Sequence, residues 1–519
     1  MRQMSRRLAG ALALVVLGIG ALVVSWCGSN PIGAAPDEPS HYVRALGVAE
    51  GDWVGAEFTR SQVLAAAPAS QRRSLSRAPL LLNQTRAVHI PGRLRPGSAG
   101  CTAFRLAAVA AACLNRAVGY WGIGPLAFTY VGDYPPFTYW PAGVAMLTRD
   151  SPTQAFVAGR LVFGLIASTL IALGLWLLVT AAENPLPALA GALIAMTPMV
   201  LFNIAVINTS ALEIAGGFAT ICAVLHLVYA SRYRRAALLV LVVAGTVLVL
   251  SRALGPLWLV LILATGLVLR GSWRTLGLAR HRVMALAAIA PLAVACAVSI
   301  WWQVSYQPTP GGSVSSRVSA FFHGFGQIPS VLKQLAGVFG WLDTQQFQPF
   351  YAVIAVLVVT LVALGWRRAS RRERIVLAAW VVGGLLLAPL LQAAVAAPGA
   401  SVQGRWLLPV VIIVPLLSAV LVARRPENGG GTRAWAVGSI VLVAVTQFLA
   451  IYANGRHYAV GPRAPLLWFT RSFWLPPLGW APWLLLAAAG AAAFVAGGVL
   501  LASGPEPGVG TTAEPRPAS

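Results

Sequence analysis

Charged residues are scarce in this chain: Asp, Glu, Lys and Arg make up only 10% of its 519 residues, and Lys333 is the only lysine. The five cysteines form no CxxC pair and the six histidines form no HExxH motif, so the usual spacings of a zinc site are missing. A P-loop and a dinucleotide-binding glycine fingerprint are also missing, which removes the sequence signs of a nucleotide site. We therefore expect no structural zinc and identify no cofactor, while a need for a divalent metal stays open.

Apolar residues take the place of the missing charges. The chain is 58% hydrophobic and its mean hydropathy is +0.75, whereas soluble domains are roughly 45–50% apolar. The net charge of +24 comes mainly from arginines in short segments between apolar runs, a pattern typical of membrane topology rather than of nucleic-acid binding. The composition predicts an all-α integral membrane protein with one polytopic domain over residues 1–502.

Twelve apolar segments have the length, about 20 residues, that a membrane-spanning helix needs. They are 8–26, 155–180, 186–204, 210–229, 235–251, 254–270, 283–302, 349–366, 374–396, 405–423, 434–452 and 482–502. The region 186–270 can also be divided differently. The first segment can be read as a cleaved signal peptide, but its length and the spans that follow favour a retained anchor.

The orientation follows from the short connections, because arginine-rich loops stay in the cytoplasm. The arginine-rich segments are 2–7, 231–235, 270–282, 366–374 and 423–433, whereas the connections 207–213 and 397–404 carry no Lys or Arg. This alternation predicts cytoplasmic termini and a large extracytoplasmic loop over 27–154, with smaller outer loops at 303–348 and 453–481. Nine of the fourteen acidic residues then face outward, so we expect polar chemistry there. The Pro- and Gly-rich tail 503–519 is expected to be disordered.

The outer loop begins with "APDEPSHYVRALGVAEGDW", residues 35–53, in which Asp37 and Glu38 are adjacent and His41 follows. The later apolar residues have a spacing that predicts an amphipathic helix on the membrane surface: Tyr42, Leu46, Val48 and Trp53. Asp37 has two interpretations at this point. It suits the start of a helix as an N-cap, and it also suits a base that takes a proton from a sugar hydroxyl.

Further along, "YVGDYPPFTYWPAGVAML" contains an aromatic cluster, namely Tyr134, Phe137, Tyr139 and Trp140. Such residues either form an interfacial belt or offer a platform for a sugar or a polyprenyl chain. Arg160 lies about one turn into the second span. An intramembrane arginine is costly, so it either reaches the outer surface, pairs with an acid such as Glu213, or binds a ligand.

Several more predicted outer positions carry polar or charged side chains. Asn208 and Glu213 lie at one outer turn and Arg252 at the next, where a purely structural ion pair is the alternative. Asp343 and Arg405 stand at the outer ends of two other spans, and arginine can engage two phosphate oxygens at once or serve as an interfacial anchor. A last outer group, Arg456, His457 and Tyr458, is also consistent with a solvated loop. Cys27, Cys101 and Cys113 lie outside, where two of them can pair.

Read in order, these segments resemble a bacterial polytopic family catalogued as domain of unknown function 2142. The resemblance is carried over residues 35–465 by "PDEPSHYVRALGVAEGDWV", "YPPFTYWPAG", "GRL" at Arg160, "INTSALE", "GVFGWLDT" and "QGRWLLP". That family is placed in the GT-C superfamily, whose members use polyprenyl-phosphate-linked sugars on the outer face. The acidic pair, "GDW", "PP" with "YW" and the following arginine are also similar to the protein O-mannosyltransferase and aminoarabinose transferase pattern.

The resemblance implies a GT-C-like fold and an inverting glycosyltransferase with Asp37 as the base, while Glu38 and His41 would orient Asp37 or the acceptor. The residues expected to bind substrate or lipid phosphate are Arg160, Arg252, Arg405, Glu213, Asn208, Tyr134, Tyr139, Trp140 and Asp343. The expected partners are membrane lipid, a polyprenyl-phosphate-linked sugar and an envelope glycan or protein acceptor, without nucleic acid. Pro39 and His41 depart from the mannosyltransferase-like pattern, so donor and acceptor are not carried over. A transporter or flippase, or a membrane scaffold, stays open as an alternative.

Overall fold

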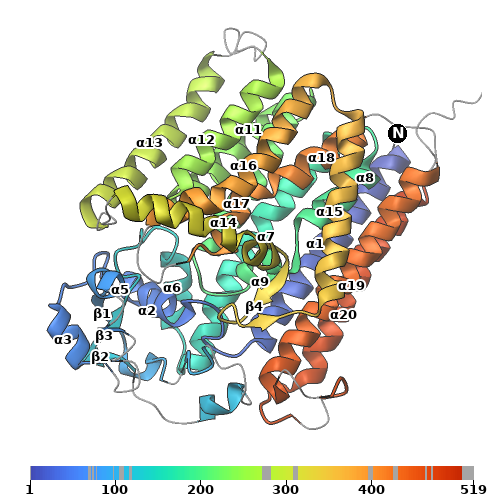
Figure 1. Ribbon diagram of the computed structural model, residues 1–519. Coiled ribbons are helices and arrows are strands. Elements are labelled where there is room, and N and C mark those ends of the chain that lie inside the picture. The colour runs from blue at the N-terminus through green and yellow to red at the C-terminus, as the bar shows by residue number, and fades with distance from the viewer. Residues whose placement is uncertain are drawn as a thin grey trace, which may run out of the picture.

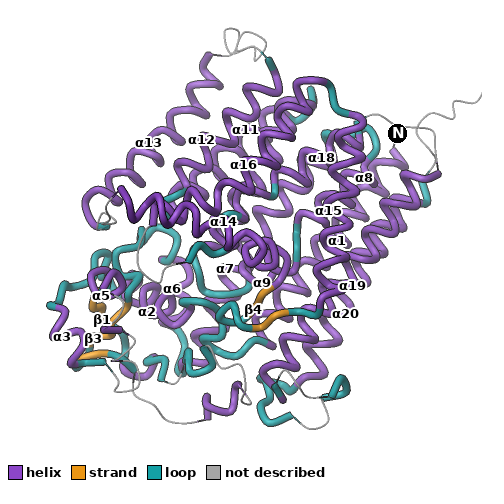
Figure 2. The backbone as a smooth tube through the Cα atoms, in the orientation of Figure 1, coloured by secondary structure: helices purple, strands orange, loops and turns teal. Residues whose placement is uncertain are grey.

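The computed structural model describes residues 2–504 apart from short segments at 68–71, 73–74, 77–78, 98, 104–109, 116–119, 272–281, 308–313, 396–400, 425–429, 462–464 and 469–471. Figures 1 and 2 show a bundle of long helices with a smaller mixed region at the end opposite the N-terminus. The expected disordered tail after residue 504 lies outside the described residues.

Nine helices in the described part of the chain are long and apolar enough to cross a membrane. They are α1 (Arg2–Ser29), α7 (Pro152–Thr180), α10 (Ser210–Tyr229), α11 (Arg234–Ser251), α13 (Arg282–Tyr306), α15 (Gln348–Arg368), α16 (Arg371–Val395), α19 (Gly430–Val460) and α20 (Trp480–Ala502). The chain is thus a multi-pass membrane protein with mostly helical structure. Each of these helices overlaps a segment expected from the sequence.

The remaining three expected spans are shorter or broken, so the number twelve is not confirmed. The expected span 186–204 is two helices, α8 (Pro185–Ala195) and α9 (Pro198–Ile204), which meet at an angle of 66°. Pro198 begins α9 and cannot donate a backbone hydrogen bond, which explains the break. The other two are α12 (Gly255–Arg270) and the pair α17 (Leu408–Val411) and α18 (Ile413–Ala423). The described residues hold nine candidate spans, or ten when the bent pair is counted as one span.

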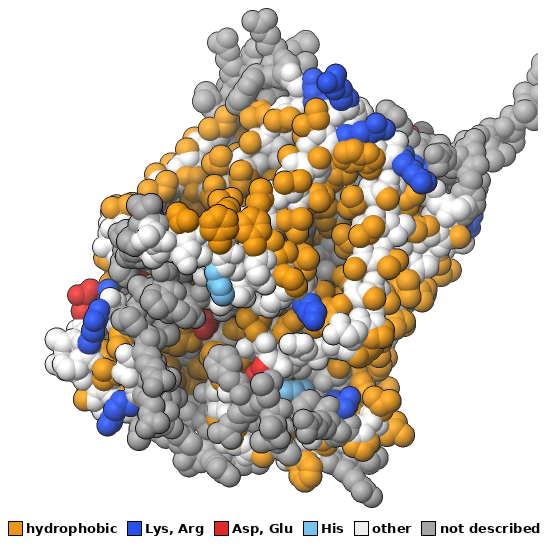
Figure 3. All heavy atoms as spheres, viewed as in Figure 1, with side chains coloured by type: hydrophobic (Ala, Val, Ile, Leu, Met, Phe, Trp, Pro, Cys, Tyr) orange, Lys and Arg blue, Asp and Glu red, His pale blue; other side chains and the backbone are white. Residues whose placement is uncertain are grey.

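The two ends of the bundle differ in character. Arg7 at the start of α1 donates a 2.7 Å hydrogen bond to the Ser503 carbonyl after α20, so the described chain ends lie together. Lys and Arg side chains lie along this edge in Figure 3, while hydrophobic side chains cover the helices. Exposed apolar residues come from several spans: Leu165, Leu239, Val359 and Leu485. An apolar belt of this kind suits contact with lipid tails.

The segment between α1 and α7 forms the mixed region. Its helices are α2 (Glu38–Ala49), α3 (Arg60–Ala65), α5 (Pro79–Gln84) and α6 (Trp140–Leu147), with short 3-10 turns η1 (Gly92–Leu94) and η2 (Ala110–Asn115). A three-stranded antiparallel sheet accompanies them, in the order β1 (Arg86–His89), β3 (Leu126–Thr129), β2 (Gly122–Ile123). The sequence predicted helices here but not this sheet. Cys101 and Cys113 form a disulfide, whereas Cys27 is a buried free thiol in α1.

The prediction of a surface-lying helix after Asp37 is wrong. Every residue of α2 from Glu38 to Val48 is buried, so α2 is an internal element of the mixed region. Its polar side is covered as well, because Arg44 donates to the carbonyls of Asp52, Trp53 and Tyr134 at 2.7–3.1 Å. α6 packs closely on α2, where a Cβ on Gly143 would lie 2.1 Å from the Ala45 carbonyl oxygen. The helical spacing was correct, but other parts of the protein cover the helix on both its apolar and its polar side.

A further helix, α14 (Val314–Gly337), crosses the bundle between α13 and α15 (Figure 1). It carries exposed apolar side chains together with polar ones, an arrangement typical of a helix lying at a membrane interface. A short hairpin of two-residue strands follows, β4 (Val338–Phe339) paired with β5 (Thr344–Gln345). The 3-10 turn η4 (Gly404–Trp406) contacts α14, so this crossing helix helps to position Arg405.

Candidate functional site

Asp37 occupies the N-cap position of α2, yet its side chain does not cap the helix. The Asp37 carbonyl starts the helix by accepting from the backbone amides of Ser40 and His41 at 2.9 and 3.0 Å. The backbone has φ of +64°, a left-handed conformation that non-glycine residues adopt uncommonly. Such a conformation turns the carboxylate away from the amides of its own helix, and strain of this kind is concentrated at functional sites. The capping interpretation therefore explains the position of Asp37 but not the use of its carboxylate.

The Asp37 carboxylate has two side-chain partners from distant parts of the chain. Arg405 forms an ion pair with its Oδ2 atom, and the Tyr130 hydroxyl donates to Oδ1 at 2.9 Å. The Asp37 side chain is 26% exposed, while that of Arg405 is 2% exposed. Burial alone would raise the pKa of Asp37, but the Arg405 guanidinium and these hydrogen bonds hold it below its usual value. The pair thus presents a charged, partly accessible carboxylate over a buried cation.

Further hydrogen bonds hold Arg405 and its neighbour Gly404 in place. The Nη1 atom of Arg405 donates to the Pro36 carbonyl at 3.0 Å, and the Asn208 side-chain amide donates to the same oxygen at 3.4 Å. The neighbouring Gly404 gives its amide to Gln334 of α14 at 2.8 Å, and a Cβ at this glycine would lie 2.7 Å from the Gln334 Cβ. Only glycine allows η4 to approach α14 this closely, so Gly404 helps to set where the guanidinium lies.

Glu38 and Arg160 form a second ion pair directly beside the first. Two hydrogen bonds of 2.6 and 2.7 Å join the guanidinium to the carboxylate, and both residues are fully buried. Arg160 also donates to the carbonyls of Cys27, Asn30 and Pro31 at 2.7–3.1 Å. The Ile207 amide donates to Glu38 at 3.1 Å. This pair ties α1, α7 and the start of α2 together.

The sequence suggested Glu213 as an acid that Arg160 could meet, and lipid phosphate as a ligand. The structure instead pairs Arg160 with Glu38, and all five N–H donors of its guanidinium are used by Glu38 and three backbone carbonyls, so none is left for a phosphate. A buried arginine must satisfy its donors locally, and the carbonyls at the end of α1 supply the acceptors. Candidate phosphate contacts are therefore left to Arg405 and Arg252.

Arg252 and Glu213 lie close together, as expected from the alternative of a structural ion pair between them. Their nearest atoms, Nε and Oε2, are 4.0 Å apart, and Trp258 donates to Glu213 at 3.2 Å. Arg252 also donates to the Ser210 hydroxyl at 2.6 Å. Its guanidinium carbon lies 5.6 Å from the centre of the Tyr134 ring, within the range of a cation–π contact. Arg252 is thereby held next to the ring that faces His41.

His41 is buried among aromatic rings. Its Nδ1 atom is 2.5 Å from the Tyr139 hydroxyl, and the centre of its ring lies 5.8 Å from that of Tyr134. Burial lowers the pKa of His41 to about 3, so the imidazole is neutral near pH 7. Tyr139 is fully buried with it, whereas Trp140 is 53% exposed at the start of α6. Of the two, Tyr139 is therefore the one that belongs to the cluster around His41.

Asp133, next to Tyr134, is a buried carboxyl with an unusual environment. The residue is 1% exposed, and neither carboxylate oxygen has a hydrogen-bond partner among the described residues. Burial raises its pKa to about 7, although Arg86 and Arg44 act against that rise. The sequence placed Asp133 outside the membrane without assigning it a role.

The raised pKa of Asp133 predicts a pH-dependent stability. Because the folded carboxyl binds its proton more tightly than the unfolded one, the free energy of unfolding falls as pH rises from about 4 to about 7. The loss amounts to at most about 4 kcal/mol. Asp133→Asn is therefore expected to raise the melting temperature of the detergent-solubilised protein at pH 8 but not at pH 4. Parallel pH profiles for the two proteins would contradict this.

Asp343 does not join the Asp37 cluster. Its Oδ1 atom accepts from the Trp341 amide at 3.1 Å and from the Thr344 hydroxyl at 3.3 Å, in the β4–β5 hairpin. It lines a separate cavity with Arg456 and His457. These two residues and Tyr458 lie in the last turns of α19, and His457 and Tyr458 are buried, so the solvated-loop interpretation is wrong for them.

Sequence reasoning missed several residues of the site. Tyr130 stands in the quoted aromatic segment but was not singled out, although a tyrosine there was an available signal. Ser210 and Trp258 gave no local sign, because their role depends on contacts with Arg252 and Glu213. Among the described residues, no group of three or more His, Cys, Asp or Glu side chains could hold a metal ion.

The cluster thus gathers Asp37, Arg405, Arg252, Tyr134 and His41 where the helical bundle meets the mixed region. Comparison with known proteins gives a family but no closer relative. The profile described as "Predicted membrane protein (DUF2142)" matches residues 21–414, well over half of the chain. Comparisons with curated proteins and with solved structures give no significant match. On this evidence, the chain belongs to the DUF2142 family of predicted membrane proteins.

Proposed function

We propose that this protein is a GT-C-type glycosyltransferase that moves a sugar from a polyprenyl-phosphate donor to a cell-envelope acceptor on the outer face of the plasma membrane. The observation that carries the proposal is the Asp37 carboxylate, which is strained at φ +64°, turned away from its own helix and partly exposed above Arg405. The acidic pair Asp37-Glu38, "GDW", "PP" with "YW" and the following arginine resemble the pattern of lipid-dependent transferases, which supports the proposal.

The chemistry needs one base and one group that stabilises a leaving phosphate. The acceptor hydroxyl oxygen attacks the anomeric carbon, its proton passes to Asp37, and the bond from that carbon to the phosphate oxygen breaks. The electron pair leaves with the polyprenyl phosphate. Attack opposite the leaving group inverts the anomeric configuration. A donor that already carries its phosphate on a lipid needs no nucleotide site, which agrees with the missing nucleotide motifs.

Arg405 and Arg252 are the groups proposed to receive the phosphate. Arg405 is occupied by Asp37 in this structure, and such a pair suits a resting state. When a phosphate engages the guanidinium, Asp37 loses its ion-pair partner and its pKa rises toward the range useful for a base. Arg252, 13% exposed in its side chain, lies on the Tyr134 side of the same cluster. Donor binding and activation of the base are thereby linked.

Transfer from a labelled donor tests the proposal. Purified protein in liposomes is expected to move radiolabelled sugar from at least one of a panel of polyprenyl-phosphate hexoses and pentoses to envelope glycan fragments. Arg405→Lys keeps the charge but loses the planar pair of donors, so the KM for the donor is expected to rise roughly 10–100-fold.

Arg424→Lys is the matched control. Arg424 pairs with Glu373 beside Tyr229, the last residue of α10, whereas Ser210 and Glu213 lie in the first turn of that helix. The donor KM of this variant is expected to stay unchanged. Failure of every donor in the panel, or an Arg405→Lys variant with an unchanged donor KM, would contradict the proposal.

A transporter is the second candidate, and the bend between α8 and α9 favours it, because transporters often bind substrate at broken helices. The carbonyl of Met196 at this break accepts from the Gln447 side chain at 2.7 Å, and Thr197 donates to the Leu335 carbonyl at 2.7 Å. The protein itself satisfies these groups at the bend. Uptake of a labelled lipid-linked sugar into proteoliposomes without glycosyl transfer would reverse the ranking.

A further inference from the structure

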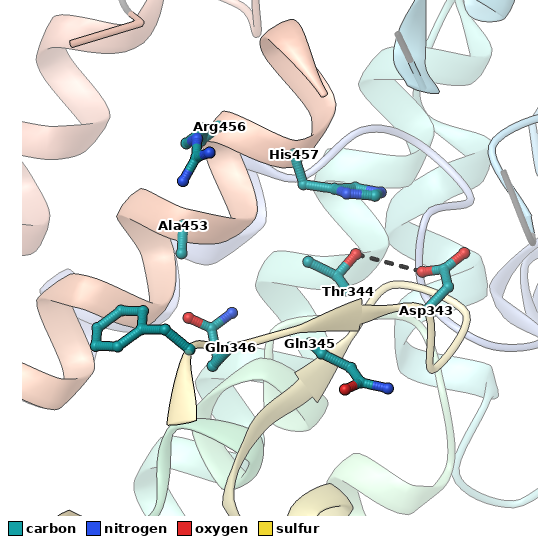
Figure 4. Close-up of a pocket in the computed structure, with 8 residues that line it drawn as sticks. Asp343, Thr344, Gln345, Gln346, Ala453, Arg456 and His457 are labelled. Atoms are coloured by element: carbon teal, nitrogen blue, oxygen red, sulfur yellow. Dashed lines mark hydrogen bonds between the residues drawn. The ribbon is translucent and has the colours of Figure 1, made fainter. Parts of the chain in front are cut away.

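A cavity of about 440 Å³ lies beside the β4–β5 hairpin and the last turns of α19, apart from Asp37. It is lined by Asp343, Thr344, Gln345, Gln346, Phe347, Ala453, Arg456 and His457. Figure 4 shows Ala453, Arg456 and His457 on α19 facing β5, which carries Thr344 and Gln345, and the next residue, Gln346. Its volume falls within the range of pockets that hold small ligands.

Two buried side chains at this cavity have unmet hydrogen-bonding capacity. Gln346 is 6% exposed, and neither its amide nitrogen nor its amide oxygen has a partner among the described residues. His457 is 4% exposed, and its Nε2 atom also has no hydrogen-bond partner among the described residues. A buried polar group without a partner is costly, so each such group calls for an explanation. A ligand that both donates and accepts hydrogen bonds would satisfy them together.

The charges around the cavity narrow the class of ligand. Asp343 contributes a carboxylate and Arg456 a guanidinium to the same lining, so a simple anion would meet the carboxylate and a simple cation the guanidinium. Gln346 both donates and accepts, and Thr344 adds a hydroxyl. The Phe347 ring, 49% exposed, supplies an apolar surface at the edge. Paired donors and acceptors beside an aromatic ring suit a neutral, hydroxyl-rich ring.

We infer that this cavity is a binding site for a neutral saccharide, contacted by Gln346, His457 and Asp343. We assign this saccharide as the acceptor of the transfer, and that assignment rests on the proposed function, whereas the binding itself does not.

The cavity is joined to the Asp37 cluster by the segment 30–36. Trp341 donates to the Gly33 carbonyl at 3.0 Å, and the Asn454 amide donates to the Asn30 side chain at 3.1 Å. The other side of the same segment is held by Arg160 through the carbonyls of Asn30 and Pro31. The hairpin and α19, which line the cavity, are therefore hydrogen-bonded to the segment that leads directly into Asp37.

Saturation-transfer NMR on the full chain in nanodiscs tests the inference. The probes are methyl mannoside, maltose and an arabinofuranosyl disaccharide, with inorganic phosphate as the anionic competitor. At least one sugar is expected to bind at millimolar concentration, and phosphate is expected not to displace it. Gln346→Leu keeps the size of the side chain but removes both polar atoms, so the Kd is expected to rise about tenfold. His457→Leu is expected to act in the same direction.

Gln327→Leu is the matched control, because Gln327 lies on α14, outside the cavity lining, and meets His323 at 3.2 Å. Its Kd for the sugar is expected to be unchanged. Asp37→Asn is expected to retain binding even though transfer is lost, which separates this inference from the proposed function. The inference is overturned if no probe sugar binds, if phosphate displaces the sugar, or if Gln346→Leu and His457→Leu both bind as wild type does.

Discussion

Asp37→Asn is expected to lower sugar transfer by about 10²–10⁴-fold while leaving the protein folded. Asparagine has the same shape as aspartate, can accept from Tyr130 and Arg405, and is among the residues that best tolerate φ of +64°. It cannot take up the acceptor proton. Asp37→Ala is a poorer test, because alanine would add backbone strain at this position and leave buried Arg405 without a partner.

Asp52→Asn is the matched control for that experiment. Asp52 also lies in the mixed region between α1 and α7, and its side chain is 28% exposed, close to the 26% of Asp37. The Asp52 carboxylate accepts a hydrogen bond from the His89 backbone amide and contacts the His89 ring, whereas the Asp37 carboxylate pairs with an arginine. Transfer by Asp52→Asn is expected to match wild type. Full transfer by Asp37→Asn, measured with the same donor and acceptor, would remove Asp37 from the chemistry.

Arg160→Met is expected to lower the free energy of unfolding by about 3–5 kcal/mol, because it leaves the Glu38 carboxylate buried without its counter-charge. Three carbonyls at the end of α1 lose a donor at the same time. Thermal unfolding in detergent measures the effect as a lowered melting temperature. The double variant Glu38→Met with Arg160→Met is expected to be more stable than Arg160→Met alone, because no charge is then left buried.

Arg424→Met is the comparison for Arg160, because Arg424 is 38% exposed and pairs with Glu373 at 3.0 Å. A partly exposed pair contributes little, so the expected loss is less than about 1 kcal/mol. If Arg160→Met and Arg424→Met lowered the melting temperature equally, the Glu38–Arg160 pair would not be the structural tie between α1, α7 and α2.

The long apolar segments were predictable because each carries its signal locally. Residues 155–180 and 210–229 required only hydropathy, and α7 and α10 follow them closely. The break at Met196 was missed, although Thr197-Pro198 was a visible signal for it. α19 continues to Val460, beyond its expected end, because packing against the 30–36 segment supports polar residues that hydropathy assigns to a loop.

The partners within the site could not be predicted from local sequence. Asp37 and Arg405 are 368 positions apart, and Glu38 and Arg160 are 122 apart. Both arginines were identified as candidates, but which carboxylate each one meets depends on the packing of the whole bundle. The adjacent acids Asp37 and Glu38 therefore have different surroundings. Asp37 is partly exposed and pairs with Arg405, whereas Glu38 is fully buried and pairs with Arg160.

A structure of the protein in nanodiscs with a non-transferable polyprenyl-phosphate sugar tests the central claim most directly. The account predicts the donor phosphate on Arg405, the Asp37–Arg405 ion pair broken, and the Asp37 carboxylate on the side of the anomeric carbon opposite the phosphate. A donor phosphate bound elsewhere, with the ion pair between Asp37 and Arg405 intact, would contradict it.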